Sequence, residues 1–199
     1  MRKIGFMGGT FDPIHNAHIE LAKQAKKQYN LNEVIFMTSG EPPHKKNRGV
    51  TDKLLRYEMV KRAVEDIDGF SASDFEIKES GSSYSLNTLL WLKERYPEDK
   101  ICFILGEDSL SDIDKWYKTD RIMRLCTLLV YPRHGMETLE ALKKRTEERY
   151  NTKIMIIDAP IYHISSTNIR NMIKDGSDVS DLLPPQVYKY IKENGIYDE

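Results

Sequence analysis

Short, continuous apolar runs recur along the chain, and each is bounded by glycine, proline or charged residues. Continuous rather than alternating apolarity is typical of parallel strands that are covered on both faces. The pattern therefore predicts buried strands at residues 4–7, 34–37, 101–105, 127–131 and 154–157.

Between these runs the apolar side chains recur at helical spacing, as they do at Leu21, Ala22, Ala25 and Tyr29. A helix that opens at Thr51-Asp52 is expected to turn its apolar positions, Leu54 among them, toward a core. Further helices are predicted after residue 85, over 137–150, after 165 and after Pro185, and residues 70–77 are expected to be extended. Strands that alternate with helices predict an α/β fold, a Rossmann-like doubly wound parallel sheet with helices on both faces.

Composition narrows the class of protein. The chain has 199 residues, 30 basic against 31 acidic, so we expect one domain over 1–199 and no global field that recruits nucleic acid or a membrane. Cys102 and Cys126 lie within or beside apolar runs, which favours buried thiols over a disulfide or a metal site. The apolar run after Met1 is too short for a signal peptide, and no stretch reaches transmembrane length. These features predict a cytoplasmic protein with no membrane partner.

The loop from Gly8 to His18 joins a predicted strand to a predicted helix. Its glycine pair lets the backbone approach a ligand closely, and the helix N-terminus favours an anion. His15 and His18 lie three apart, so within a helix they share a face and can donate to phosphate oxygens. A glycine pair is also an ordinary turn, and two such histidines also fit a plain surface pair. Neither the P-loop pattern nor the three-glycine dinucleotide pattern is present.

A second polar stretch, residues 164–170, precedes another predicted helix. Its run of hydroxyls is suited to capping a helix. Arg170 lies about one turn into that helix, where its guanidinium can share a phosphate with the hydroxyls and N–H groups. A capped helix with a surface arginine is the plainer interpretation.

Other candidates follow predicted strands or loops. Lys45 lies in a basic loop after residue 37, which is either solvated or reaches an anionic substrate. Asp108, just after Gly106, is expected to cap the next helix, and the alternative is that it accepts from ribose hydroxyls. Ser82, Ser83 or Ser85 is suited to capping a helix, and the alternative is that Ser85 or Thr88 contacts a small polar ligand. Trp116 is either part of the core or a stacking surface.

The string from Gly8 to His18 resembles a signature of the nucleotidylyltransferase superfamily, Gly-Gly-x-Phe-Asp-x-x-His-x-Gly-His, with Ala17 where the family has glycine. Residues 164–170 resemble the other signature of that superfamily, Ile-Ser-Ser-Thr-x-x-Arg. Within the superfamily, residues 42–45, 83–88, 116–118 and 194–197 are similar to the bacterial nicotinate-nucleotide adenylyltransferases, with Ser85 where threonine is usual.

The resemblance implies an enzyme of NAD biosynthesis that takes ATP and nicotinate mononucleotide as substrates, releases pyrophosphate and uses Mg²⁺. It implies that His15, His18 and Arg170 are catalytic. The residues that it places at ATP are Gly8, Gly9, Thr10, Ala17, Gly106, Asp108, Ser165, Ser166, Thr167 and Arg133. The residues that it places at the mononucleotide are Lys45, Tyr84, Ser85, Thr88, Trp116 and Tyr117.

Two alternatives remain at this stage. One is another nucleotidylyltransferase, such as pantetheine-phosphate adenylyltransferase, which shares both signatures but is typically shorter and lacks the Trp116 region. The other is a nucleotide sensor without turnover, to which only Ala17 points. No protein ligand of Mg²⁺ is assigned, and a homo-oligomer is possible but has no readable interface.

Overall fold

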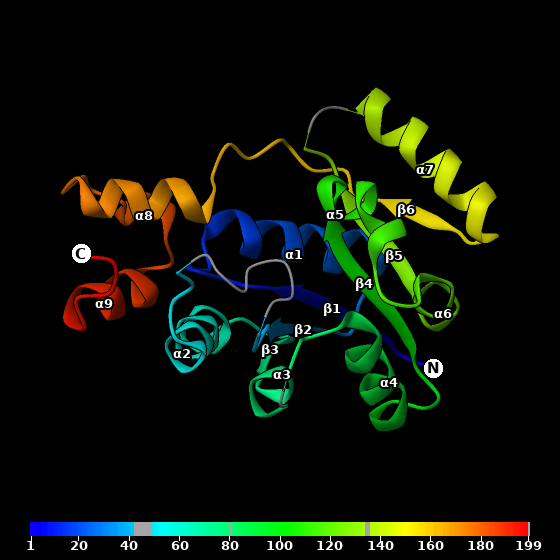
Figure 1. Ribbon diagram of the computed structural model, residues 1–199, viewed down its shortest axis with the longest axis horizontal. Helices are drawn as coiled ribbons and strands as arrows, with labels where there is room; N and C mark the ends of the chain where they lie inside the picture. Colours follow the sequence, from blue (N-terminus) through cyan, green and yellow to red (C-terminus); the bar gives the residue numbers. More distant parts are fainter. Residues whose placement is uncertain (42–48, 80, 134–135, 199) are drawn as a thin grey trace. The chain divides into compact units, whose positions relative to one another are not determined.

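A computed structural model describes residues 1–41, 49–79, 81–133 and 136–198 (Figure 1). The chain divides into two compact units. The first unit comprises Met1–Gly8, Leu21–Ile35 and Tyr84–Tyr162. The second comprises Gly9–Glu20, Phe36–Ser83 and His163–Glu199. The single domain expected over 1–199 stays a prediction.

The strands form a six-stranded sheet in the order β3-β2-β1-β4-β5-β6. β1 pairs in parallel with β4, β4 with β5, and β5 with β6, in registers that include Phe6 opposite Phe103 and Phe103 opposite Leu128. This order confirms the predicted doubly wound sheet, and the five apolar runs are five of its six strands. The strands are β1 (Lys3–Gly9), β2 (Glu33–Thr38), β3 (Phe70–Ser73), β4 (Lys100–Gly106), β5 (Thr127–Tyr131) and β6 (Ile154–Ile156).

The predicted helices are also present, with short additional ones between them. The α-helices are α1 (Asn16–Tyr29), α2 (Lys53–Val64), α3 (Phe75–Lys78), α4 (Ser85–Arg95), α5 (Glu107–Ser111), α6 (Thr119–Leu125), α7 (Met136–Tyr150), α8 (Ser166–Lys174) and α9 (Pro185–Glu193). Two 3₁₀ turns are η2 (Ile113–Lys115) and η3 (Ser180–Leu182). In the part of the chain that the structure describes, no helix is long and apolar enough to span a membrane.

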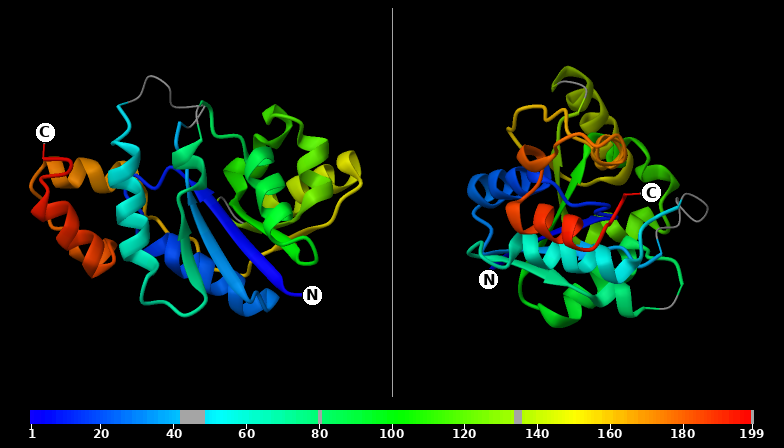
Figure 2. Two further views of the ribbon diagram at one scale, coloured as in Figure 1. Left: turned by 90° about the horizontal axis from the view of Figure 1, so that it is seen from below. Right: turned by 90° about the vertical axis from the view of Figure 1, so that its left-hand side faces the viewer.

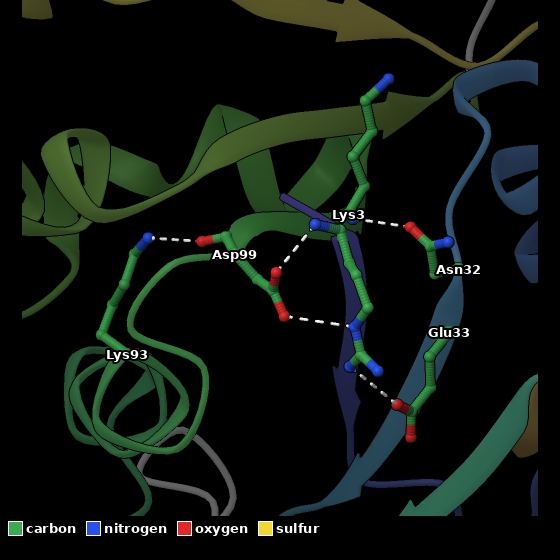
Figure 3. A network of polar contacts seen from close by, with 6 residues as sticks. Lys3, Asn32, Glu33, Lys93 and Asp99 are labelled. Atoms are coloured by element: carbon green, nitrogen blue, oxygen red, sulfur yellow. Dashed lines mark hydrogen bonds and ion pairs between the residues drawn. The ribbon is translucent and has the colours of Figure 1, made fainter.

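The first unit has an aromatic and aliphatic core around β4, where the rings of Phe6 and Phe103 stack at 4.2 Å. A polar network fixes the start of β1 beside the start of β4 (Figure 3). The backbone N–H of Arg2 donates to Asp99 Oδ1 at 2.8 Å, and that of Lys3 donates to Asn32 Oδ1 at 2.8 Å. These contacts set the register at which the parallel strands begin.

The free edge of β6 is covered by the end of α1. The side-chain amide of Gln28 donates to the carbonyl of Asp158 at 2.7 Å and accepts from its N–H at 2.9 Å. The hydroxyl of Tyr29 donates to the carbonyl of Ile156. Between them, the N–H of Ile157 points the other way and donates to the carbonyl of Val130 in β5. The backbone groups of Ile156 and Asp158 that face away from β5 are therefore the ones that bond to side chains of α1.

In the second unit, α2 and α9 pack against each other (Figure 2). Asp52 caps α2, because its carboxylate accepts from the N–H of Leu54 at 2.8 Å. Arg62 lies 4.6 Å above the ring of Tyr190. The predicted opening of α2 and the predicted proline start of α9 are both confirmed.

Several local predictions are wrong. Residues 70–77 are extended only to Ser73, because Asp74 starts the helical turn α3 and pairs with Lys78 at 2.7 Å. Leu54 is 61% exposed, and the helix turns the guanidinium of Arg56 inward instead. The serines near residue 83 do not cap α4, whose N-cap is Tyr84, and Ser83 Oγ accepts from Gly40 N–H. Cys102 is buried, as predicted, whereas Cys126 is only partly buried, and both are free thiols.

Candidate active site

The order of the strands reverses between β1 and β4. In open α/β sheets ligands bind beyond the carboxyl ends of the strands at such a reversal. β1 is followed by residues 10–15, here called the first loop, and β4 is followed by α5. The sequence analysis singled out both segments.

The first loop has an unusual backbone. Phe11 has a φ of +50°, the left-handed region that bulky side chains rarely adopt. The Asp12–Pro13 peptide is cis. The Phe11 ring is 4% exposed and meets the His18 ring edge-on at 5.1 Å. The loop is therefore built into the core of its unit rather than left on the surface.

His15 and His18 form one structural element at the start of α1. Their rings stack at 3.7 Å, and the carbonyl of His15 accepts from the N–H of His18 at 2.9 Å. The N–H of His15 in turn donates to His18 Nδ1 at 3.3 Å. His18 thus reaches back to the N-cap residue, as glutamate does in a capping box.

This contact assigns the tautomer of His18. Because Nδ1 accepts a hydrogen bond, the neutral ring carries its proton on Nε2. His18 is half-buried, whereas His15 is 2% exposed. His18 therefore presents a donor at the N-terminus of α1, where the helix dipole favours an anion.

Ala17 lies in the first turn of α1, where the superfamily signature has glycine. Its side chain is 3% exposed, so the methyl group packs within the protein. The departure from the signature is thus accommodated by packing in this chain.

The start of α8 is fastened to the first loop. Ser165 caps the helix by accepting from the N–H of Asn168 at 3.2 Å, as the run of hydroxyls predicted. Ser166 Oγ donates to the carbonyl of Pro13 at 2.9 Å, and Arg170 Nη1 donates to the carbonyl of Asp12 at 2.7 Å. Two helix N-termini that are 150 residues apart in sequence, at 16 and 166, therefore meet at one loop.

The sequence analysis missed two residues that hold the first loop. Arg56, 1% exposed, donates to the carbonyls of Thr10 at 2.7 Å, Gly40 at 3.1 Å and Thr51 at 2.8 Å. The hydroxyl of Tyr197 donates to Asp12 Oδ1 at 2.7 Å. Burial lowers the pKa of Arg56, with Asp12 acting in the opposite direction.

In the first unit, α5 and the loop after β5 form a charged group. Gly106 is the N-cap of α5 and Asp108 lies in the first turn without capping it, so the capping prediction for Asp108 is wrong. Arg133 Nε lies 3.7 Å from Asp108 Oδ2, and the N–H of Arg133 donates to Glu107 Oε2 at 2.7 Å. Asp108 lines a cavity of about 430 Å³ between α5 and α7, which lie side by side in Figure 1.

Aromatic side chains gather on another part of the first unit. Residues 112–118, here called the aromatic loop, connect α5 to α6. Tyr117 lies 5.1 Å from Tyr84, and both rings are exposed, at 48% and 40%. Trp116 is half-buried and packs against Phe103 at 5.9 Å. Ser85 begins α4, and Thr88 is buried one turn later.

The loop is held by contacts on both sides of Trp116. Asp114 accepts from Arg149 Nη1 at 2.7 Å and from the Tyr150 hydroxyl at 2.6 Å. The Thr119 hydroxyl lies 3.1 Å from the carbonyl of Trp116.

The structure thus brings the predicted site residues together in two groups. The second unit holds Thr10, His15, Ala17, His18, Ser165, Ser166, Thr167 and Arg170 around the first loop. The first unit holds Gly106, Asp108 and Arg133 at α5, and Tyr84, Ser85, Thr88, Trp116 and Tyr117 at the aromatic loop. Gly8 and Gly9 end β1, and Lys45 lies outside the described residues. The functional roles of all these residues stay predictions.

Comparisons with known proteins agree on one family. Residues 6–172 match the family model described as cytidylyltransferase-like. A Clostridium botulinum protein named "probable nicotinate-nucleotide adenylyltransferase" is 47% identical over 96% of each chain. A Clostridium tetani protein of the same name is 43% identical over 99% of this chain and 100% of its own.

Solved structures share the fold at much lower identity. The nicotinic acid mononucleotide adenylyltransferase of Plasmodium falciparum, complexed with NaAD, has a TM-score of 0.80 at 20% identity over 100% of this chain and 98% of its own. Its complex with APC gives a TM-score of 0.78 with the same coverage.

Proposed function

The chain belongs to the cytidylyltransferase-like family and, within it, to the nicotinate-nucleotide adenylyltransferases, and from this membership we propose its reaction. It transfers the adenylyl group of ATP to nicotinate mononucleotide, giving nicotinate adenine dinucleotide and pyrophosphate, in NAD biosynthesis. We also propose a cytoplasmic location for this reaction.

The chemistry requires positioning rather than a protein nucleophile. A 5′-phosphate oxygen of the mononucleotide forms a bond to the α-phosphorus of ATP, and the bond from that phosphorus to the bridging oxygen of pyrophosphate breaks. Charge develops on the phosphoryl oxygens and on the leaving group. Fixed donors that meet this charge lower the barrier.

The observation that carries the proposal is the meeting of α1 and α8 at the first loop. Nδ1 of His18 accepts from the N–H of His15, so Nε2 is the ring nitrogen that we assign to donate to a phosphoryl oxygen. His15 supports that ring by stacking on it. Arg170 directs one side of its guanidinium at Asp12, and its Nη2 lies 3.4 Å from the Thr167 hydroxyl beside the N-terminus of α8.

These contacts give the groups separate roles in the proposal. His18 donates to charge that develops around the α-phosphorus. Arg170, with the hydroxyl of Thr167 and the backbone N–H groups at the start of α8, binds the β- and γ-phosphates. Ser166 contributes its N–H there, because its hydroxyl donates to the carbonyl of Pro13. The backbone of Gly8, Gly9 and Thr10 lies along the adenosine and the α-phosphate.

The first unit supplies the remaining groups. We assign the nicotinate ring to the face of Trp116 and its carboxylate to the surroundings of Tyr84, Ser85 and Tyr117. Asp108 accepts from a ribose hydroxyl, and Arg133 serves an anionic group. Lys45 is assigned to an anionic group of either substrate on the resemblance alone.

A divalent cation is expected to bind to the phosphates of the nucleotide rather than to protein side chains. The described residues contain no group of three or more histidine, cysteine or acidic side chains that could hold a metal ion. Both carboxylate oxygens of Asp12 are already engaged, by Tyr197 and by the N–H of Thr51. We therefore assign Mg²⁺ to phosphate oxygens and water, where it neutralises charge on the triphosphate when bound. Excess EDTA is expected to stop turnover, and Mg²⁺ to restore it.

The test is pyrophosphate release with ATP and Mg²⁺ and one acceptor at a time. Turnover with nicotinate mononucleotide and much slower turnover with nicotinamide mononucleotide is the expected result, because a site built for a carboxylate leaves polar groups unpaired against the amide. Equal rates would keep the reaction and overturn the assignment of the carboxylate. Turnover only with pantetheine phosphate, or ATP binding without turnover, would overturn the proposal.

A further inference from the structure

The carboxylate and carbonyl of Asp12 join three distant segments of the second unit. Oδ1 accepts from the Tyr197 hydroxyl at 2.7 Å, and Oδ2 accepts from the N–H of Thr51 at 3.3 Å. The carbonyl oxygen accepts from Arg170 at 2.7 Å. Asp12 is 4% exposed, so its side of these partly buried contacts is shielded from water, which strengthens them.

The first loop needs such support because of its backbone. Phe11 holds the left-handed conformation without being glycine, and residues in that state persist only where their surroundings fix them. The residue before it is held by Arg56, through the Thr10 carbonyl. The residue after it is Asp12. His15 and His18 follow three and six residues later. A shift of Asp12 would therefore move both imidazoles.

Tyr197 is itself held in an unfavourable conformation. Its φ is +75°, which is an outlier for a bulky side chain. Ile196 beside it is 5% exposed, and its N–H donates to the carbonyl of Ile191 at 3.1 Å, so the segment is folded back onto α9. Burial, with Asp12 adding to its effect, raises the pKa of Tyr197. The hydroxyl therefore stays protonated and remains a donor at neutral pH.

We propose that Tyr197 is a positioning residue of the reaction, whose hydroxyl fixes Asp12 and thereby the first loop and its two histidines. The inference rests on the proposed function. Tyr197 acts on the reaction through Asp12, and its hydroxyl also contacts the side chain of Thr51. A loop that shifts by about 1 Å loses roughly a hundredfold in rate when geometry is the source of catalysis, so a single hydrogen bond at this place has leverage.

A purely structural role makes a different prediction. If Tyr197 only anchors the segment after α9, its effect is independent of Asp12. If it acts through Asp12, removing the hydroxyl has no further effect once the Asp12 carboxylate is gone. A double-mutant cycle separates the two cases.

The experiment compares Tyr197→Phe, Asp12→Asn and the double variant with the unaltered chain, and Tyr190→Phe serves as the matched control. Tyr190 is on α9, seven positions earlier, and its ring face contacts Arg62. We expect Tyr197→Phe to lower kcat about tenfold, the scale of one hydrogen bond to a charged group, with KM for nicotinate mononucleotide within about twofold. The double variant is expected to match Asp12→Asn alone, and Tyr190→Phe to match the unaltered chain.

A kcat for Tyr197→Phe within about twofold of the unaltered chain, or losses that multiply in the double variant, would overturn the inference. Amide hydrogen exchange gives a readout that does not depend on turnover. Residues 14–18 are expected to exchange faster in Tyr197→Phe but not in Tyr190→Phe, and equal exchange would likewise contradict the inference. If the unaltered chain fails to use nicotinate mononucleotide, the proposed function falls and the exchange result alone decides the role of Tyr197.

Discussion

The first loop and the aromatic loop are held by opposite means. Arg56 and Asp12, which fix the first loop, are 1% and 4% exposed, and their contacts go largely to backbone groups. The aromatic loop is tied by Asp114 to Arg149, whose side chains are 33% and 60% exposed. The first loop is therefore held by buried hydrogen bonds, and the aromatic loop is held by an exposed ion pair.

The difference matches what each loop is proposed to bind. Charge that develops in a transition state is best met by donors that do not move. A flat ring needs only an aromatic face, which remains effective when a side chain adjusts. Burial of polar contacts therefore marks the part of the protein where precision is needed.

Arg56→Met is the most severe test of the buried contacts that hold the first loop. The change leaves the buried carbonyls of Thr10, Gly40 and Thr51 without their donor. We expect the free energy of unfolding to fall by about 3–5 kcal/mol, measured by urea denaturation. Arg62→Met, on the same helix, removes an ion pair with Glu58 and a ring contact with Tyr190, and is expected to change it by less than about 2 kcal/mol. Equal losses in the two variants would mean that the buried contacts of Arg56 contribute no more to the free energy of unfolding than the surface contacts of Arg62.

His18→Ala removes the proposed donor to the phosphoryl group. We expect kcat to fall by about two to three orders of magnitude, as for the loss of an oxyanion donor. His163→Ala, at an exposed histidine, is the control and should leave kcat unchanged. A near-normal kcat for His18→Ala would sink the role given to this side chain.

Trp116→Ala probes the aromatic loop. Stacking of an aromatic side chain on a base contributes about 1–3 kcal/mol, so KM for nicotinate mononucleotide should rise about tenfold or more. KM for ATP should change less than about twofold, and Trp116→Phe should recover most of the loss. An increase in KM for ATP instead would mean that Trp116 contacts ATP and not the mononucleotide.

Asp114→Asn gives the smallest effect. Because the contact is exposed, we expect KM for nicotinate mononucleotide to rise only about two- to fivefold, with stability changed by less than about 1 kcal/mol. The matched control is Asp74→Asn, which weakens a surface pair with Lys78 of the same 2.7 Å length. A loss as large as that of Trp116→Ala would show that the aromatic loop is as rigidly held as the first loop.

The sequence predicted five of the six strands because each of them is a continuous apolar run, whereas β3, with the sequence Phe-Ser-Ala-Ser, is not one. It located the first loop and α8 because hydroxyls, glycines and histidines have positional meaning there. It predicted Ser165 as part of a cap for the same reason.

Arg56 and Tyr197 were missed for a physical reason. Most of their partners are backbone carbonyls or a carboxylate far away in sequence, up to 185 residues for Tyr197. Such contacts leave no periodic signal, and a lone arginine among Leu55, Met59 and Val60 reads as a surface residue. α3 was missed because a four-residue helix is too short to show a period.

The contact between α1 and β6 has a consequence for how copies of this chain meet. A strand with unpaired N–H and carbonyl groups invites a strand of another molecule, which is a route to aggregates. Here the side chain of Gln28 bonds to the N–H and carbonyl of Asp158 as a neighbouring strand would, and the hydroxyl of Tyr29 donates to the carbonyl of Ile156. These contacts block strand pairing between copies of the chain at Ile156 and Asp158.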